Sequence, residues 1–182
     1  DIAIDLLRLM EAGMNGCMDS TACNYDTTAT VNTGCSYACI GCMDSLALNY
    51  DGAGITIDDG SCLYPPSNND CSNAILMTCG DILTSSTVNA TASGYGYINW
   101  NGVSTGIDIW YSIVGTGGDF TVSTCGSDFD TYLSVYTDSC PLDSTAAPIA
   151  VNDDANCVPG QWSNASIVTF TSVPGTMYYI SA

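Results

Sequence analysis

From residue 71 onward, apolar residues occur in short runs separated by Gly, Asn, Asp and Ser. Ile107, Ile109, Tyr111 and Ile113 alternate with their neighbours, as do the residues of 132–136, and such alternation predicts strands with one buried face. We expect strands at 74–79, 85–91, 107–114, 120–124, 131–136, 149–152, 166–171 and 177–181. Because no helical period interrupts this spacing, the fold class predicted for 71–182 is mainly β, an antiparallel β-sandwich.

Residues 1–15 carry two overlapping patterns. Ile2, Leu6 and Leu9 fall near one face of a helix, with Asp1 in position to cap it. Ile2, Ile4 and Leu6 also alternate with Asp1, Ala3 and Asp5, as the residues of a strand would. A short amphipathic helix and a strand able to pair with another chain therefore both remain open.

Residues 16–64 contain an internal repeat. The stretch GCMDSTACNYD at 16–26 recurs as GCMDSLALNYD at 41–51, identical at nine of eleven places. Turn signals at 32–34 and 58–60 place a cysteine within two residues after each turn, Cys35 and Cys62. Each repeat is therefore predicted to be a loop closed by cysteines, with the pairs Cys17–Cys35, Cys23–Cys39 and Cys42–Cys62.

The stretch 65–70 has two prolines followed by polar residues. It is interpreted as a linker, since proline stiffens a chain and the polar residues are not expected to pack. A domain boundary is therefore predicted there.

The sandwich region holds five cysteines, an odd number. We expect Cys140–Cys157 to tie a long connection, and two of Cys71, Cys79 and Cys125 to pair. The sulfur left over would pair outside this chain or remain as a buried free thiol.

The net charge of −18 comes from nineteen acidic residues against the single base Arg8. Such a surface repels phosphate backbones and anionic lipids, which argues against nucleic acid and membrane surfaces as partners and favours divalent cations. Eleven cysteines without any histidine fit disulfides rather than zinc, and hence an extracellular or cell-surface location. Neither a signal peptide nor a run of eighteen apolar residues is visible, so a processed chain, or a segment of a longer one, without membrane insertion is expected.

Two resemblances add to these expectations. The repeats, with DDGSCLY at 58–64, resemble the cysteine-rich repeats of secreted proteins from aquatic bacteria. The first copy departs from that pattern, because Asn32-Thr33-Gly34 replaces the acidic turn. The motifs DIWYS at 108–112, FDTYLSVY at 129–136 and GTMYYI at 175–180 resemble bacterial pre-peptidase C-terminal domains. That resemblance implies a non-catalytic jelly roll accompanying secreted or surface proteins, here one strand short.

A sandwich that lacks a strand leaves backbone groups unpaired beside its core. Either the polypeptide continues, or another chain supplies the strand. The alternating Ile2, Ile4 and Leu6 are the candidate donor, and head-to-tail donation between copies would build an open filament.

Calcium is the expected cofactor, because carboxylate and amide oxygens are the ligands that Ca²⁺ prefers. The main candidate ligands lie at expected strand ends: Asp128, Asp130, Asn152, Asp153 and Asp154. A weaker second set lies in the second repeat: Asp44, Asn49, Asp51, Asp58 and Asp59. Both sets have an alternative interpretation as solvated turn residues whose side chains cap local backbone groups.

Glycans are a further expectation. Asn89 and Asn164 begin N-linked sequons. Ser20, Thr27, Ser45 and Ser144 follow aspartates in motifs that resemble O-glycosylation sites of some aquatic bacteria, although each motif alone is short enough to arise by chance.

Catalysis lacks its usual residues, since the chain has no histidine, no lysine and one glutamate, Glu11. The sequence thus favours an extracellular structural or adhesive protein that polymerises with copies of itself. The alternative is a non-catalytic calcium- or carbohydrate-binding module of a larger secreted enzyme or adhesin. Trp100, Trp110 and Trp162 exposed on one face would favour sugar binding, whereas the alternating strand around Trp110 predicts a core position for it.

Overall fold

A computed structural model describes residues 13–93, 106–141 and 146–182, which form two compact units, Asp1–Tyr64 and Pro65–Ala182. The expected helix or donor strand, with Ile2, Ile4 and Leu6, lies outside the described residues.

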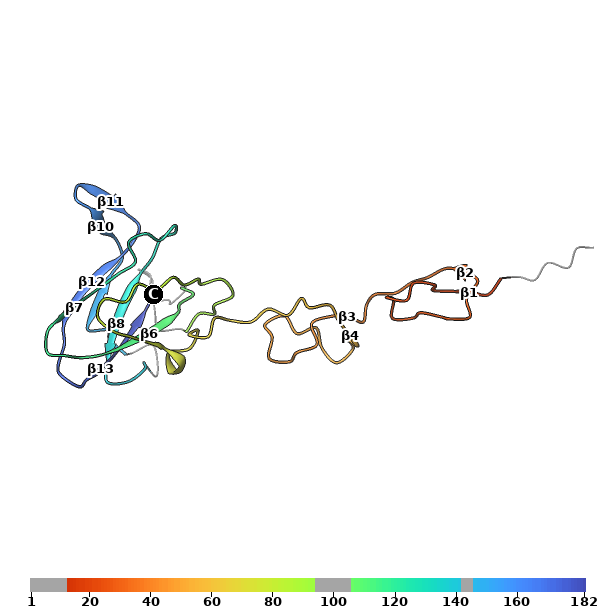
Figure 1. The fold of residues 1–182 in the computed structure, drawn as a ribbon, viewed down its shortest axis with the longest axis horizontal. Helices are drawn as coiled ribbons and strands as arrows, with labels where there is room; N and C mark the ends of the chain where they lie inside the picture. The colour runs from red at the N-terminus through yellow and green to blue at the C-terminus, as the bar shows by residue number, and fades with distance from the viewer. Residues whose placement is uncertain (1–12, 94–105, 142–145) are drawn as a thin grey trace, which may run out of the picture. The chain divides into compact units, whose positions relative to one another are not determined.

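The first unit contains the two repeats, and each is a loop pinned by a pair of two-residue strands (Figure 1). In the first repeat β1 (Asn15–Gly16) pairs in parallel with β2 (Val31–Asn32), and in the second β3 (Ile40–Gly41) pairs in parallel with β4 (Ile57–Asp58). The expected turns are present, since Gly34 and Gly60 have φ of 66° and 73°, which glycine adopts readily.

Disulfides replace a hydrophobic core in these repeats. Among the described residues of the unit, the buried apolar side chains are Cys17 and Ala22 in the first repeat and Cys42 and Ala47 in the second. The structure forms the three predicted pairs, Cys17–Cys35, Cys23–Cys39 and Cys42–Cys62. Each repeat therefore folds around a cystine and one alanine.

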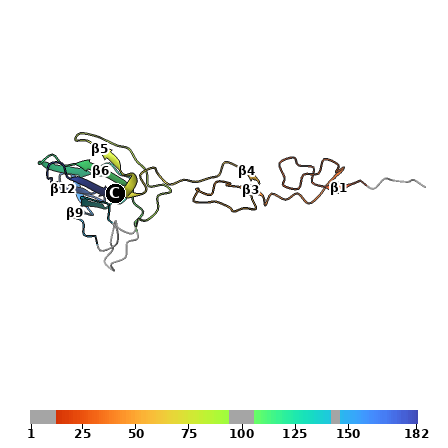
Figure 2. The ribbon, with the colours of Figure 1, turned by 90° about the horizontal axis from the view of Figure 1, so that it is seen from below.

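The second unit is a β-sandwich. One sheet has five strands in the order β5 (Ile75–Met77), β6 (Trp110–Val114), β13 (Met177–Ser181), β8 (Leu133–Thr137) and β9 (Ala150–Asn152). Figure 2 shows β5 and β6 at one side of this sheet and β9 at the other. The expectation of a purely antiparallel sheet is wrong at one place, because β5 pairs with β6 in parallel.

The second layer of the sandwich is smaller. It consists of β7 (Asp119–Ser123) paired antiparallel with β12 (Ile167–Thr171). A separate hairpin, β10 (Ala155–Val158) and β11 (Gln161–Ser163), and one turn of 3-10 helix, η1 (Cys71–Asn73), complete the described elements. Neither the hairpin nor the parallel pairing is evident from the apolar pattern.

The core lies between the two layers. The rings of Phe120, Phe170 and Tyr178 form a continuous series from β7 through β12 to β13, with centroid separations of 5.9 Å and 4.9 Å. On the opposite face of the large sheet Trp110 is 0% exposed and packs against Tyr136, so the central strands are buried on both faces. The core position predicted for Trp110 is confirmed.

Two expectations about local structure are wrong. The run 85–91 forms no strand, because its only large apolar residue, Val88, is 71% exposed and the run has no hydrophobic face. The two units divide at Pro65, where the boundary was expected, but residues 65–70 belong to the second unit and their asparagines are buried, so the stretch is not a free linker. Asn68 is 3% exposed there; its amide donates to the Trp110 carbonyl at 3.0 Å, and its own carbonyl accepts from the Trp110 N–H at 2.8 Å. These hydrogen bonds offset the cost of burying a polar side chain.

The predicted bridge Cys140–Cys157 is also wrong, and so is the expected pairing of two among Cys71, Cys79 and Cys125. The structure pairs Cys71 with Cys140 and Cys125 with Cys157. The first bridge joins η1 to the segment after β8, and the second joins the segment after β7 to β10. Both are contacts between elements far apart in sequence, which spacing along the chain does not reveal. The remaining thiol, Cys79, is exposed and not buried.

Candidate calcium centre

Three of the five expected ligands come together on the surface of the sandwich. One carboxylate oxygen from each of Asp130, Asp153 and Asp154 lies within 4.8 Å of the other two. Asp130 precedes β8, and the two adjacent aspartates lie in the turn between β9 and β10. Because β8 and β9 are neighbours in the sheet, their pairing brings the two loops together.

The cluster concentrates negative charge. Burial raises the pKa of Asp153, and the neighbouring charges of Asp154 and Asp130 raise it further. The Asp153 backbone is held in place, since its carbonyl accepts a short hydrogen bond from the Ser166 hydroxyl. Three oxygen donors with mutual repulsion fit a Ca²⁺ ion completed by water, and all three side chains are exposed and accessible.

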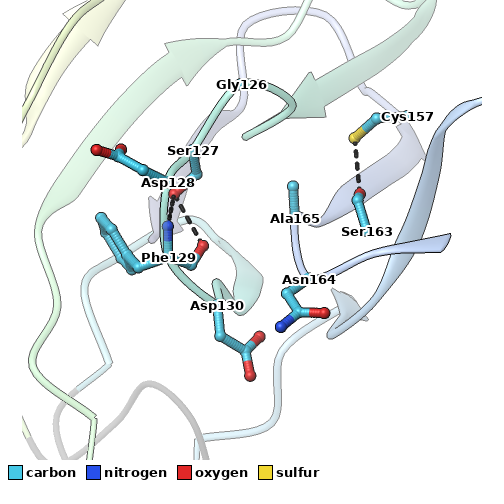
Figure 3. A pocket seen from close by; sticks show the side chains of 9 residues that line it. All are labelled: Gly126, Ser127, Asp128, Phe129, Asp130, Cys157, Ser163, Asn164 and Ala165. Atoms are coloured by element: carbon cyan, nitrogen blue, oxygen red, sulfur yellow. Dashed lines mark hydrogen bonds between the residues drawn. The ribbon is translucent and has the colours of Figure 1, made fainter.

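The cluster does not include Asp128, and the side-chain oxygen of Asn152 has a different partner. Figure 3 shows the loop around Phe129, in which the Asp130 carboxylate points toward the side of Asn164 and the Asp128 carboxylate points away from both. The Asn152 side-chain oxygen accepts the Ile167 N–H at 2.8 Å, and thereby ties the end of β9 to β12. This side-chain oxygen therefore contributes to the packing of the two layers.

Two pockets flank the cluster. The smaller, of ≈170 Å³, is the one in Figure 3 and includes Asp128, Asp130 and Asn164 in its wall. The larger, of ≈420 Å³, is lined by Asp108, Asp130, Asp153 and the terminal Ala182 among others. Burial raises the pKa of Asp108, whose carboxylate accepts hydrogen bonds from Ser93 and from the Ser181 hydroxyl. The sequence pattern gave no signal for this buried carboxylate.

The second expected set of ligands instead caps turns in the second repeat. The Asp44 carboxylate accepts the Leu46 N–H and the Tyr64 hydroxyl, and Asp51 accepts the Cys42 N–H. The other members cap the loop ends in the same manner: Asn49 with Ser61 and Leu63, Asp58 with Gly60, and Asp59 with Ser61. Across the described residues the only acidic group close enough to hold a metal is that of Asp130, Asp153 and Asp154.

An aspartate–tyrosine hydrogen bond recurs in both repeats and was missed from the sequence. Tyr37 donates to Asp19 at 2.6 Å, and Tyr64 donates to Asp44 at 2.7 Å. In both repeats the aspartate comes two residues after the first cysteine of the bridge and the tyrosine two residues after the second, and this shared position is the signal that could have identified them. The bond ties the end of each loop to its first turn, beside the cystine.

These carboxylates predict acid sensitivity of the repeats. The Tyr37 hydroxyl, with the Thr21 amide and hydroxyl, lowers the pKa of Asp19, and the Leu46 amide with the Tyr64 hydroxyl lowers that of Asp44. A lowered folded pKa contributes stability above the ordinary value of 3.8, and that stability is lost as the pH falls through the folded pKa. We expect the Thr21 and Leu46 amides to lose protection from hydrogen exchange, corrected for intrinsic rates, between about pH 5 and about pH 2. Unchanged protection would contradict this assignment.

The expected glycosylation sites differ in accessibility. Ser20, Thr27, Ser45 and Asn164 are exposed, whereas Asn89 is half-buried with a positive φ of 64°. Ser144 lies outside the described residues, as does Trp100. Accessible acceptors therefore lie on both units.

Calcium should stabilise the sandwich through the Asp130, Asp153 and Asp154 cluster. A ligand that binds only the folded state raises its stability by RT ln(1 + [L]/Kd), which is about 3 kcal/mol at a hundredfold excess over Kd. We expect the thermal midpoint to rise with Ca²⁺ and the rise to vanish in Asp153→Asn. The matched control is Asp138→Asn, because Asp138 is exposed and has a φ of 68° that asparagine tolerates. An equal calcium shift in both variants would exclude the cluster.

Comparison of the chain with protein-family models, with curated proteins and with solved structures finds no match. Within the described ranges, the chain has no helix with the length and apolar character needed to cross a membrane.

Proposed function

We propose that the chain is an extracellular structural or adhesive subunit that joins copies of itself by strand exchange. The observation that carries the proposal is the unequal size of the two layers in the second unit. Two described strands face a sheet of five, and Ile75, Met77 and Tyr111 on the inner face of β5 and β6 remain only half-buried. A further strand in the small layer would cover them.

Two other features support a structural role outside the cell. Ten of the eleven cysteines form disulfides, and such density is typical of proteins from oxidising compartments. The sequence has no histidine or lysine, so it lacks the usual bases and nucleophile partners of hydrolytic enzymes. A folded, cross-linked chain with few catalytic groups is what a structural protein requires.

Electron microscopy of the purified chain tests the proposal. The intact chain is expected to form fibres, and a chain without residues 1–7 is expected to remain dispersed because it has lost the alternating donor. Ile4→Asp, which places a charge on the apolar side of the donor, should act like the deletion. Ala3→Ser, on the polar side, is the matched control and should still assemble. Fibres of normal length after the deletion would refute strand exchange through this segment.

The second candidate function is a calcium-dependent accessory module, which the cluster of Asp130, Asp153 and Asp154 favours. Sugar stacking on Trp110 is excluded from that alternative, because the side chain is fully buried. Repeating the microscopy with a chelator distinguishes calcium that joins subunits from calcium that is bound within an accessory module. Fibres that disperse would place Ca²⁺ in the joints between subunits, and dispersed particles in both conditions would favour the accessory module.

A further inference from the structure

The outer edge of β7 has the properties of a strand acceptor, and this inference rests on the proposed function. Among the described strands β7 pairs only with β12. Its ladder is regular over five residue pairs, and its sequence, Asp119 to Ser123, contains no proline, lysine or bulge. Those are the devices by which proteins usually prevent an edge strand from pairing with another chain.

The direction of the backbone groups follows from the hydrogen bonds at both ends of the ladder. The Gly118 carbonyl accepts from the Ser172 N–H at 2.9 Å, and the Thr124 N–H donates to the Ser166 carbonyl at 2.9 Å. Because hydrogen-bonded and non-bonded pairs alternate along an antiparallel ladder, the backbone groups of Phe120 and Val122 also face β12. Those of Asp119, Thr121 and Ser123 therefore face outward.

The opposite edge of this small layer, that of β12, is already occupied in part. The Ile167 N–H on that edge is bonded to the Asn152 side chain at the end of β9. Hence β12 lies toward the β9 side of the large sheet, and β7 lies toward the β6 and β5 side. A strand added to β7 would lie over β6 and β5, where Ile75, Met77 and Tyr111 are half-buried.

We propose that residues 1–6 of a second copy pair antiparallel with the outer edge of β7. Apolar residues must face the core, so Ile4 and Leu6 lie opposite inward-facing residues of β7. The register that places Leu6 opposite Phe120 and Ile4 opposite Val122 sets Asp5 opposite Thr121. A shift by two residues in one direction would set Asp5 opposite Asp119, and like charges directly opposite each other are unfavourable. A shift by two in the other direction would set Ile4 opposite Thr124, beyond the end of β7.

Two proline substitutions test which edge is used. Thr121 and Thr169 are cross-strand partners joined by their hydroxyls at 2.9 Å, and the backbone N–H of each points away from the other strand. Thr121→Pro removes an N–H from the β7 edge, and Thr169→Pro removes one from the β12 edge. Each substitution also removes the hydrogen bond between the two threonine hydroxyls. Fibres are expected to be lost in Thr121→Pro and retained in Thr169→Pro. A cooperative thermal unfolding transition should show that both variants are folded.

Full-length fibres of a folded Thr121→Pro chain would overturn the assignment of β7, as would equal loss in both variants. Hydrogen exchange on the unaltered protein covers the case in which a variant does not fold. The amides of Thr121 and Ser123 should be at least tenfold more protected in fibres than in chains without residues 1–7. Equal protection would likewise exclude β7. If the deletion of residues 1–7 abolishes fibres but these edge tests fail, strand exchange is retained and the acceptor is another edge. Fibres formed without residues 1–7 refute the proposed function itself.

Discussion

Replacing both Cys42 and Cys62 with serine is expected to unfold the second repeat. The bridge closes a loop of 20 residues, for which chain-entropy arguments assign about 3 kcal/mol. The repeat has no other large buried side chain to compensate, since Ala47 alone accompanies the cystine. Amide signals of Leu46 and Leu63, which are held by Asp44 and Asn49, should lose their protection from exchange.

The chain provides two controls for that experiment. Cys79→Ser removes the exposed free thiol and should leave both repeats unchanged. Replacing Cys23 and Cys39 with serine should have the smaller effect, because the second repeat has Leu48 at the position of Cys23 and folds with one bridge. Protection that survives in the Cys42 and Cys62 double variant would show that turn capping alone maintains the loop.

Leu133→Ala is expected to destabilise the sandwich strongly. Leu133 is 0% exposed on β8, in the core cluster with Val135, Val168 and Ile180. Truncating a buried leucine costs about 2–5 kcal/mol, through lost burial and the cavity left behind. That is a large part of a typical stability of about 5–15 kcal/mol, so the denaturation midpoint should fall sharply.

Leu76→Ala is the matched control, because Leu76 lies on β5 of the same sheet and is 60% exposed. Surface substitutions usually change stability by less than about 0.5 kcal/mol. Guanidinium unfolding of both variants measures the difference, provided that the slope is unchanged. Equal midpoints would mean that the cluster around Leu133 does not support the fold.

Local features of this fold were predictable from the sequence. Cys35 and Cys62 each follow a glycine turn, so the chain reverses there and returns the cysteine to the start of its loop. The strand at Trp110–Val114 was also predictable, because a strand places successive side chains on opposite faces and the sequence alternates there. The expected single buried face was wrong for this strand, since Trp110 and Ile113 lie on opposite faces and both are buried. Both signals act over a few residues.

Contacts between distant segments were not predictable in this way. Cys71 pairs with a cysteine 69 residues away, and only the folded sheet brings the two together. Asn68 has the character of a loop residue in the sequence, yet its amide groups find partners on Trp110 and the residue is buried. Among the expected calcium ligands, Asn152 accepts a hydrogen bond from Ile167 of β12. This contact depends on the position of β12 in the folded sandwich.

The free thiol has a consequence for how the protein becomes oxidised. Cys79 follows Cys71 by eight positions, whereas the native partner Cys140 is 69 positions away. Closing the shorter loop is favoured by about 2 kcal/mol in the unfolded chain, so oxidation before folding should join Cys71 to Cys79 ahead of Cys140. Reaching the native bridge then requires attack of the Cys140 thiolate on that disulfide, which releases Cys79. Efficient maturation would thus depend on an isomerase, or on oxidation slow enough for the sheet to form first.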